Sequence, residues 1–296
     1  MALFEIKKRL ESVADTRKIT QALQMVAASR MKGFQRKAVH ARAYTDALLQ
    51  ALRLAAPHME ELPLFAPREP GRVVFVLLTA NKGLCGALNA RLVSELFSSE
   101  RFRSVPVERR VLLTIGNKGY EAAMRAGHPV ERHFAEIGED VDPLQALMVI
   151  GPIVSWWESA QASEIVLCAP HYHNPFESYP TVRDFLPLSS AVPESETEAP
   201  EPLSYFEPDA DHVADALSHQ IIESMFLQAF YELKAAEYSS RMVAMQKASD
   251  AASDVVTALT LEYNKTRQAV ITAQLSELAC ADEAMQEDEI LPLAAP

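Results

Sequence analysis

A series of mostly apolar positions in the first 55 residues follows an unbroken alternation of four and three, and it turns polar between Arg17 and Gln24. The series is Ile6, Leu10, Val13, Arg17, Thr20, Gln24, Ala27, Met31, Phe34, Ala38, Ala41, Thr45, Leu48, Leu52 and Ala55. This spacing is the heptad seam of a coiled coil. Gly33 is the only glycine before Pro57, and no proline precedes Pro57. The pattern therefore predicts one long helix over residues 1–57.

A second apolar series lies in residues 210–281 and steps by threes, fours and sevens. It comprises Ile222, Ala229, Leu233, Ala236 and Val243 and then, after a phase shift near Met245, Ala248, Ala251, Val255, Leu259, Thr266 and Val270. Neither glycine nor proline occurs from Asp209 to Leu291. These residues predict a second long helix that pairs with the first in an antiparallel coiled coil. Both series are rich in Ala, which lets the two backbones approach closely.

The predicted helices are too long for a compact domain. At about 1.5 Å per residue they would span roughly 80 Å and roughly 100 Å or more. A compact globule of this many residues has a radius of gyration of about 19 Å. We therefore expect the helices to project from the body, the alternative being a packed helical domain with hidden breaks.

The pattern changes between the helices to short apolar runs that alternate with helical stretches. The runs are Arg72–Thr79, Arg110–Ile115 and Glu164–Ala169, with a further edge strand over Tyr179–Leu188, and the helical stretches are Ala87–Phe97, Lys118–Ala126 and Pro143–Ala162. Continuous apolar strands alternating with helices predict a parallel sheet covered on both faces. We expect a Rossmann-like α/β domain over residues 72–190, an acidic Pro-rich connector over 191–209 and a disordered acidic tail over 282–296.

Composition narrows the classes of protein that fit this pattern. Of 296 residues 49% are hydrophobic, and the formal net charge is −12. An acidic surface argues against nucleic acid or anionic lipid as the partner of the whole molecule. The three cysteines are far apart, so neither a disulfide framework nor a zinc site is predicted. No run approaches the roughly 20 apolar residues of a membrane span, and the first residues do not resemble a targeting leader.

The first predicted helix is basic although the whole chain is acidic. Through Pro57 it carries eleven Lys and Arg residues against four Asp and Glu residues. Apolar Ile19, Leu23, Met25 and Val26 lie off its seam, where an isolated coiled coil would carry polar groups. The basic charge of this helix has three possible explanations. The helix could be an ordinary solvated helix, a rod that fits inside an acidic protein sleeve, or a helix that binds nucleic acid.

Three features between the helices invite a catalytic or ligand-binding hypothesis. The turn Asn81–Gly86 follows the first strand but lacks the glycine spacing of phosphate-binding loops. Cys85 lacks an identifiable base for a thiol enzyme, and a buried, inert cysteine is the alternative. His171 and His173 lack Cys or carboxylate partners at ligand spacing, so a solvated loop is the alternative to a metal site.

Three ordered motifs resemble those of the gamma subunits of F-type ATP synthases. They are KITQALQMVAASRM at residues 18–31, RMVAM at 241–245 and YNKTRQAVIT at 263–272. The segments GLCGALN at 83–89 and YFEPD at 205–209 also resemble family patterns. The resemblance covers the chain to about Leu278.

This resemblance implies a non-catalytic rotor shaft that couples ion flow to the conformational cycle of catalytic beta subunits. Partners would be the alpha and beta subunits, the epsilon subunit and the c-ring, with no direct nucleotide, nucleic acid, metal or cofactor. The shaft would lie on the cytoplasmic face of a bacterial plasma membrane and touch that membrane only through the rotor ring. The implied contacts with the alpha/beta ring are Lys18, Leu23, Met25, Arg30, Lys32, Arg241, Arg267, Gln268 and Thr272, and Tyr205 would face epsilon and the rotor ring.

The chain also departs from the family pattern. Asn81 stands where Asp is usual, and Gln274 stands where Glu is usual. Gln21 replaces a basic residue, and Leu23 replaces Met. The run after RMVAM is altered at Gln246 and Lys247. These departures suggest a divergent bacterial member, with a second, sodium-translocating enzyme as an alternative. The remaining hypotheses are a coiled-coil scaffold or nucleic-acid-binding protein and a nucleotide-dependent enzyme.

Overall fold

The computed structural model describes residues 2–55, 62–135, 137–138, 141, 143–191, 207 and 209–289. The chain divides into two compact units, a smaller one of Met1–Leu23 with Met245–Pro296 and a larger one of Gln24–Ala244. Each unit combines segments that are far apart in the sequence, because both long helices pass from one unit into the other. The division into helix, domain, connector, helix and tail made from the sequence remains a prediction.

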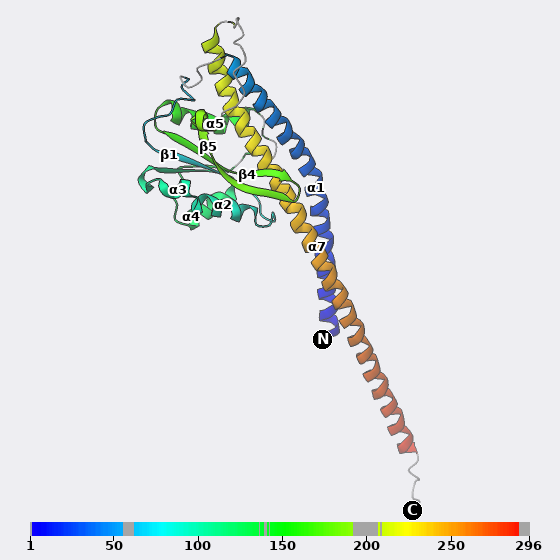
Figure 1. Ribbon diagram of the computed structural model, residues 1–296. Helices are drawn as coiled ribbons and strands as arrows, with labels where there is room; N and C mark the ends of the chain where they lie inside the picture. The colour runs from blue at the N-terminus through cyan, green and yellow to red at the C-terminus, as the bar shows by residue number, and fades with distance from the viewer. Residues whose placement is uncertain are drawn as a thin grey trace, which may run out of the picture. The chain divides into compact units, whose positions relative to one another are not determined.

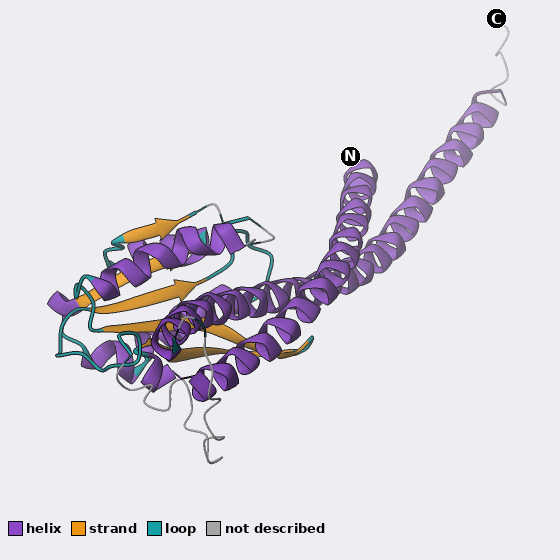
Figure 2. Ribbon diagram, turned by 90° about the horizontal axis from the view of Figure 1, so that it is seen from above, coloured by secondary structure: helices purple, strands orange, loops and turns teal. Residues whose placement is uncertain are grey.

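The first and last helices of the chain are long and the segment between them forms a mixed sheet, which confirms the fold class expected from the sequence. Helix α1 covers Ala2–Ala55 and helix α7 covers Ala210–Glu289 (Figure 1). In the larger unit the two helices lie side by side (Figures 1 and 2). Most of the predicted seam of α1 is buried there. The buried seam positions of this part of α1 are Ala27, Met31, Phe34, Ala38, Thr45, Leu48 and Leu52.

The seam of α7 in the smaller unit agrees with the prediction at Leu259 and differs from it by one position at Ala251. Met245, Ala252 and Leu259 are buried at intervals of seven residues, whereas the predicted Ala251 and Val255 are exposed. Adjacent apolar residues such as Ala251 and Ala252 do not reveal which face of an Ala-rich helix is buried, and the phase shift placed near Met245 selected the wrong one of these two.

The central sheet has five strands in the order β3-β2-β1-β4-β5. The strands are β1 Val73–Leu78, β2 Arg110–Ile115, β3 Arg132–Phe134, β4 Glu164–Asn174 and β5 Glu177–Leu186. Strands β1 to β4 pair in parallel, and β5 pairs with β4 in antiparallel orientation. The sequence pattern missed β3, which has only three residues, and the second half of β4, where His171 and Asn174 interrupt the apolar run.

Helices cover both faces of the sheet (Figures 1 and 2). The helices of this body are α2 Leu88–Ser98, α3 Glu100–Ser104, α4 Asn117–Arg125, α5 Pro143–Glu158 and α6 Leu188–Ala191, with a 3-10 turn at Val107–Arg109. In Figure 1, α2, α3 and α4 lie on one side of the strands and α5 on the other. All six residues of β1 are buried, as expected for a strand with both faces covered.

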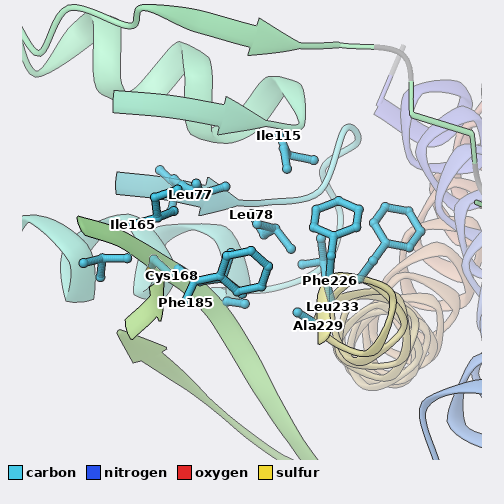
Figure 3. Packing of buried hydrophobic residues seen from close by; sticks show 14 of the residues in the cluster. Leu77, Leu78, Ile115, Ile165, Cys168, Phe185, Phe226, Ala229 and Leu233 are labelled. Carbon is cyan, nitrogen blue, oxygen red and sulfur yellow. The ribbon is translucent and has the colours of Figure 1, made fainter. Parts of the chain in front are cut away.

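The core joins the sheet to helix α7. Phe226, Ala229 and Leu233 of α7 point towards the sheet residues, with Leu78 nearest the helix in the view (Figure 3). All four residues are at most 1% exposed. Burying large apolar side chains contributes on the order of 1.5–3 kcal/mol each, so this section of α7 is anchored to the body as well as to α1.

Candidate partner-binding site

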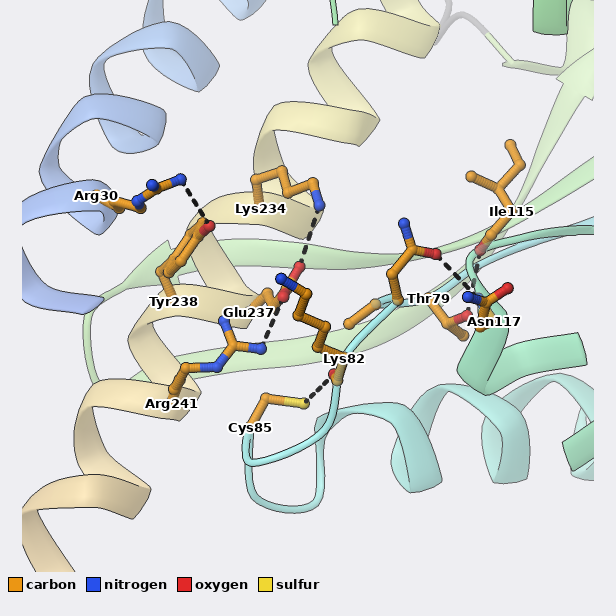
Figure 4. A network of polar contacts seen from close by, with 12 residues as sticks. Arg30, Thr79, Lys82, Cys85, Ile115, Asn117, Lys234, Glu237, Tyr238 and Arg241 are labelled. Carbon is orange, nitrogen blue, oxygen red and sulfur yellow. Dashed lines mark hydrogen bonds and ion pairs between the residues drawn. The ribbon is translucent and has the colours of Figure 1, made fainter. Parts of the chain in front are cut away.

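Tyr238 of α7 is the centre of a contact between the two long helices. Its ring stacks on Phe34 of α1, with 5.6 Å between ring centroids. The guanidinium of Arg30 lies 5.9 Å from the ring centroid, and Nη1 of Arg30 donates to the Tyr238 hydroxyl at 3.4 Å (Figure 4). The guanidinium of Arg241 lies 5.3 Å from the same centroid. Burial raises the pKa of the Tyr238 hydroxyl, which therefore stays neutral.

A buried carboxylate orders the charged groups beside this ring. Oε1 of Glu237 accepts from Nη2 of Arg241 at 2.8 Å, and Oε2 accepts from Nζ of Lys234 at 3.3 Å (Figure 4). Nη2 of Arg241 also donates to the carbonyl of Gly83 at 3.1 Å. The Arg241 side chain is only 13% exposed. Arg241 therefore fastens α7 to the β1–α2 turn, and its contact with an alpha/beta ring remains a prediction.

Helix α1 presents basic and apolar groups to solvent in the larger unit. Met25 and Val26 are 61% and 53% exposed. Lys32 lines a shallow surface hollow of about 650 Å³ together with Arg36, Val39 and His40. This surface combines positive charge with uncovered apolar area, the combination expected of a helix that fits an acidic protein sleeve.

The smaller unit carries the other predicted contact residues of α1. Lys18 pairs with Asp15 at 3.1 Å, but both side chains are at least 68% exposed. An ion pair this exposed contributes about 0–1 kcal/mol to stability. Lys18 can therefore leave Asp15 at little cost and pair with a carboxylate of another protein. Ile19 is 61% exposed and Leu23 is 36% exposed.

Arg267, Gln268 and Thr272 lie on α7 within one and a half turns of each other, and the side chains of Gln268 and Thr272 are exposed. The Thr272 hydroxyl donates to the carbonyl of Gln268 at 2.9 Å. Their place on the helix leaves these side chains accessible to a partner. Their contact with an alpha/beta ring stays a prediction.

Further exposed apolar side chains follow on the same stretch of α7, and the sequence analysis missed them. Leu261, Val270, Ile271, Leu275 and Leu278 are between 40% and 75% exposed. Only Val270 belonged to the predicted seam. The signal was present in the sequence, because apolar residues on several faces of one helix indicate a helix enclosed by protein.

The structure gives no support to a phosphate site at the β1–α2 turn. The amide of Ala80 donates to Oδ1 of Asn89, and the amide of Asn117 donates to Oδ1 of Asn81, both at 3.0 Å. These bonds tie the end of β1 to α2 and the Asn81 side chain to the start of α4. A tight turn between strand and helix is the better interpretation.

Cys85 and the two histidines do not form a catalytic or metal centre. Burial, followed by the charge of Glu237, raises the pKa of the Cys85 thiol, which disfavours the nucleophilic thiolate. Nδ1 of His171 lies 3.2 Å from Oε2 of the buried Glu232. Among the described residues, no group of three or more His, Cys, Asp or Glu side chains could hold a metal ion.

Two further predictions from the sequence concern Tyr205 and membrane-spanning segments. The predicted contact residue Tyr205 lies outside the described residues. Within the described helices, none is both long and apolar enough to cross a bilayer.

A family model and curated relatives both match almost the whole chain. A protein-family model described as ATP synthase matches residues 2–285. The curated ATP synthase gamma chain of Polaromonas sp. is 34% identical over 95% of this chain and 98% of its own length. Those of Cupriavidus necator and Heliobacterium modesticaldum are 35% and 31% identical, each over 93% of this chain and 96% of its own length.

Solved structures agree at the level of the fold. A chain of the Euglena gracilis mitochondrial ATP synthase matches with a TM-score of 0.69 and 17% identity over 100% of this chain and 98% of its own. A chain of the Tetrahymena thermophila mitochondrial ATP synthase central stalk and c-ring matches with a TM-score of 0.60 and 23% identity, covering 78% of this chain and 99% of its own.

Proposed function

Because the chain belongs to the family of ATP synthase gamma chains, we propose that it is the rotating shaft of its complex and has no catalytic site of its own. The main support for this role is the combination of basic and apolar side chains on the surface of the two long helices. Met25 and Lys32 stand exposed on a part of α1 whose seam is already filled, and Leu275 stands on a stretch of α7 in which residues 267–282 are all exposed. Exposed apolar groups on a paired helix are explained by a surrounding protein sleeve.

The proposed sleeve is the alpha/beta ring of the ATP synthase, whose beta subunits carry out the ATP chemistry. A shaft can bias the conformations of these subunits only through contacts whose free energies differ between rotational positions. Weak exposed pairs, of which Lys18 with Asp15 is an example on this chain, contribute about 0–1 kcal/mol each. Many modest contacts permit rotation, whereas a few strong ones would hold the shaft at one angle.

The α/β body is proposed to carry the torque between this shaft and the epsilon subunit and c-ring. Its connection to the helices is rigid, since the core joins α7 to the sheet and Arg241 joins α7 to the β1–α2 turn. The complex is proposed to sit on the cytoplasmic face of a bacterial plasma membrane, with the rotor ring as the only route from this chain to the lipid.

Three further functions considered from the sequence are not favoured. The curated relatives described above are ATP synthase gamma chains and give no preference for a sodium-translocating enzyme. A nucleotide-dependent enzyme would need the glycine spacing of a phosphate-binding loop, and the turn Asn81–Gly86 lacks it. A nucleic-acid-binding role leaves the exposed apolar side chains of α1 unexplained.

Co-purification tests the proposed role. An affinity-tagged form of this chain, expressed in its own host, should bring down alpha and beta subunits in a complex that hydrolyses ATP. The role would be excluded if the folded chain were recovered without these subunits. Binding of RNA with a steep dependence on salt concentration would instead support the nucleic-acid alternative.

A further inference from the structure

Arg30 is an exposed residue of α1 whose guanidinium is held by a buried ring of α7. Nη1 of Arg30 donates to the Tyr238 hydroxyl at 3.4 Å, and the guanidinium lies 5.9 Å from the ring centroid. Tyr238 itself is only 6% exposed. Val26, one turn before Arg30, is 53% exposed, so Arg30 belongs to the basic and apolar surface of α1. A buried residue of one long helix therefore orients an exposed residue of the other.

The Tyr238 ring is itself fixed by both long helices. It stacks on Phe34 of α1, with 5.6 Å between the ring centroids and 5° between the ring planes. The guanidinium of Arg241 on α7 lies 5.3 Å from the Tyr238 centroid and is bonded in turn to Glu237. In Figure 4 the Tyr238 side chain lies between those of Arg30 and Arg241. The hydroxyl of this packed ring is thus a fixed anchor for a long and flexible arginine.

The Tyr238 hydroxyl orders Arg30 without neutralising its charge. Burial and then the charge of Glu237 raise the pKa of the hydroxyl and outweigh the adjacent guanidinium groups, so the hydroxyl stays neutral. Lys18, by contrast, must give up Asp15 before it binds another carboxylate. A guanidinium has five N–H donors in a planar fork, so one bond to a hydroxyl is compatible with a bidentate bond to a carboxylate. Arg30 is therefore oriented and still suited to an anionic partner.

Ordering Arg30 in advance changes the kind of contact that it makes. An unrestrained arginine loses much of its rotamer freedom when it binds, and a side chain that is already restricted loses less. A restricted side chain also points in fewer directions. The shaft acts only through contacts whose free energies differ between rotational positions, and a contact made from a narrow range of directions depends more sharply on the angle.

We propose that Tyr238 is a positioning residue of the ring-contact surface, which holds Arg30 in the orientation in which Arg30 meets a carboxylate of the alpha/beta ring. This inference rests on the proposed function, because it requires the ring as the partner of Arg30. It assigns a part in coupling to a buried residue of α7 that acts on the partner only through a side chain of α1.

A double-mutant cycle in the assembled complex tests the proposal. The rate of ATP turnover at saturating ATP is measured for complexes with the natural chain, Tyr238→Phe, Arg30→Ala and both changes together. Phenylalanine retains the ring on Phe34 and removes only the hydroxyl. Losing a surface contact of Arg30 should change the turnover rate roughly twofold, and Tyr238→Phe should change it less, in the same direction. The double variant should match Arg30→Ala, because Tyr238 then has nothing to position.

Tyr44→Phe provides the matched control. The Tyr44 hydroxyl on α1 accepts from Nε2 of Gln220 on α7 at 2.8 Å, so it also joins the two helices, but Tyr44 is not among the predicted ring contacts. A positioning role predicts an unchanged turnover rate in Tyr44→Phe, whereas general bracing of the helices predicts similar effects of both tyrosine variants.

Four results would overturn the proposal. They are natural turnover in Tyr238→Phe, natural turnover in Arg30→Ala, a further change when Tyr238→Phe is added to Arg30→Ala, and an equal change in Tyr44→Phe. Alpha and beta subunits would still co-purify with the chain in each case, so the proposed function would stand. Absence of these subunits from the complex of the natural chain would instead exclude the function itself.

Discussion

Nη2 of Arg42 on α1 lies 2.8 Å from Oε1 of Glu232 on α7, and the Glu232 side chain is only 2% exposed. The same carboxylate accepts from Nε2 of Gln228 at 3.0 Å and from the backbone amide of Tyr172 on β4 at 3.2 Å. One buried carboxylate thus joins both long helices to the sheet. Any torque between the α/β body and the long helices must be transmitted through contacts such as those of Glu232.

Replacing Glu232 with Ala should destabilise the isolated chain by about 3 kcal/mol or more, because it leaves a buried amide unpaired and removes the partner of Arg42. Glu232→Gln keeps an acceptor for the Tyr172 amide and should cost less than half as much. The free energy of unfolding in urea measures both effects. Equal losses for the two variants would show that the carboxylate's hydrogen bonds contribute little.

The contribution of Glu232 should depend on pH. Burial raises the pKa of its carboxyl, but hydrogen bonds from Arg42, Gln228 and the Tyr172 amide outweigh burial and hold the pKa below its ordinary value of 4.5. A lowered folded-state pKa stabilises the fold above the unfolded pKa, and this stabilisation is lost as pH falls through the folded value. The difference in unfolding free energy between the natural chain and Glu232→Gln should therefore shrink as the pH falls below the ordinary carboxyl pKa of 4.5. A difference that grows on acidification would contradict this assignment.

Two glycines should respond to alanine with opposite signs. A Cβ on Gly119 would lie 2.7 Å from Oγ1 and 3.0 Å from Cγ2 of Thr79, whose hydroxyl is itself bonded to the Gly119 amide. Gly119→Ala should destabilise the chain by about 1–3 kcal/mol. Gly33 lies inside α1, and a methyl group added there would meet nothing within 4 Å, so Gly33→Ala should stabilise by about 0.5–1 kcal/mol. Thermal unfolding of both variants checks the signs, and a stabilising Gly119→Ala would show that the first turn of α4 can move away from Thr79.

Arg267→Ala with Gln268→Ala should weaken coupling in the assembled complex without unfolding the chain. Both side chains lie on the solvent-accessible part of α7, so the unfolding free energy should change by about 0.5 kcal/mol or less. The expected result is lower ATP-driven ion pumping per ATP hydrolysed, measured in membrane vesicles. Glu262→Ala, at an exposed position of the same helix, is the control, and unchanged pumping in the double variant would exclude Arg267 and Gln268 as ring contacts.

The sequence predicted best those elements whose pattern of apolar residues alone determines the structure. An unbroken heptad series without Pro predicted α1 and its buried positions Ala27, Met31 and Phe34, and continuous apolar runs predicted β1 and β2. Beyond Met245 the predicted seam of α7 was right at Leu259 but wrong at Ala251 and Val255, because the pairs Ala251–Ala252 and Val255–Val256 have nearly the same apolar character and only the packing partner selects one residue of each.

The polar connections could not be predicted from spacing. Glu232 and Arg42 are 190 residues apart, and Arg241 reaches the carbonyl of Gly83 across 158 residues. Such pairs depend on how the sheet is placed against the helices.

Rotation of this chain inside the working complex is the most direct measurement of the proposed role. Val107 is 68% exposed, so Val107→Cys supplies an attachment point for a bead once the exposed Cys280 is replaced by Ser; Cys85 and Cys168 are buried. With the beta subunits fixed to a surface, the shaft role predicts that the bead turns in one direction while ATP is hydrolysed. ATP hydrolysis by complexes that contain this chain, with beads that remain stationary, would contradict it.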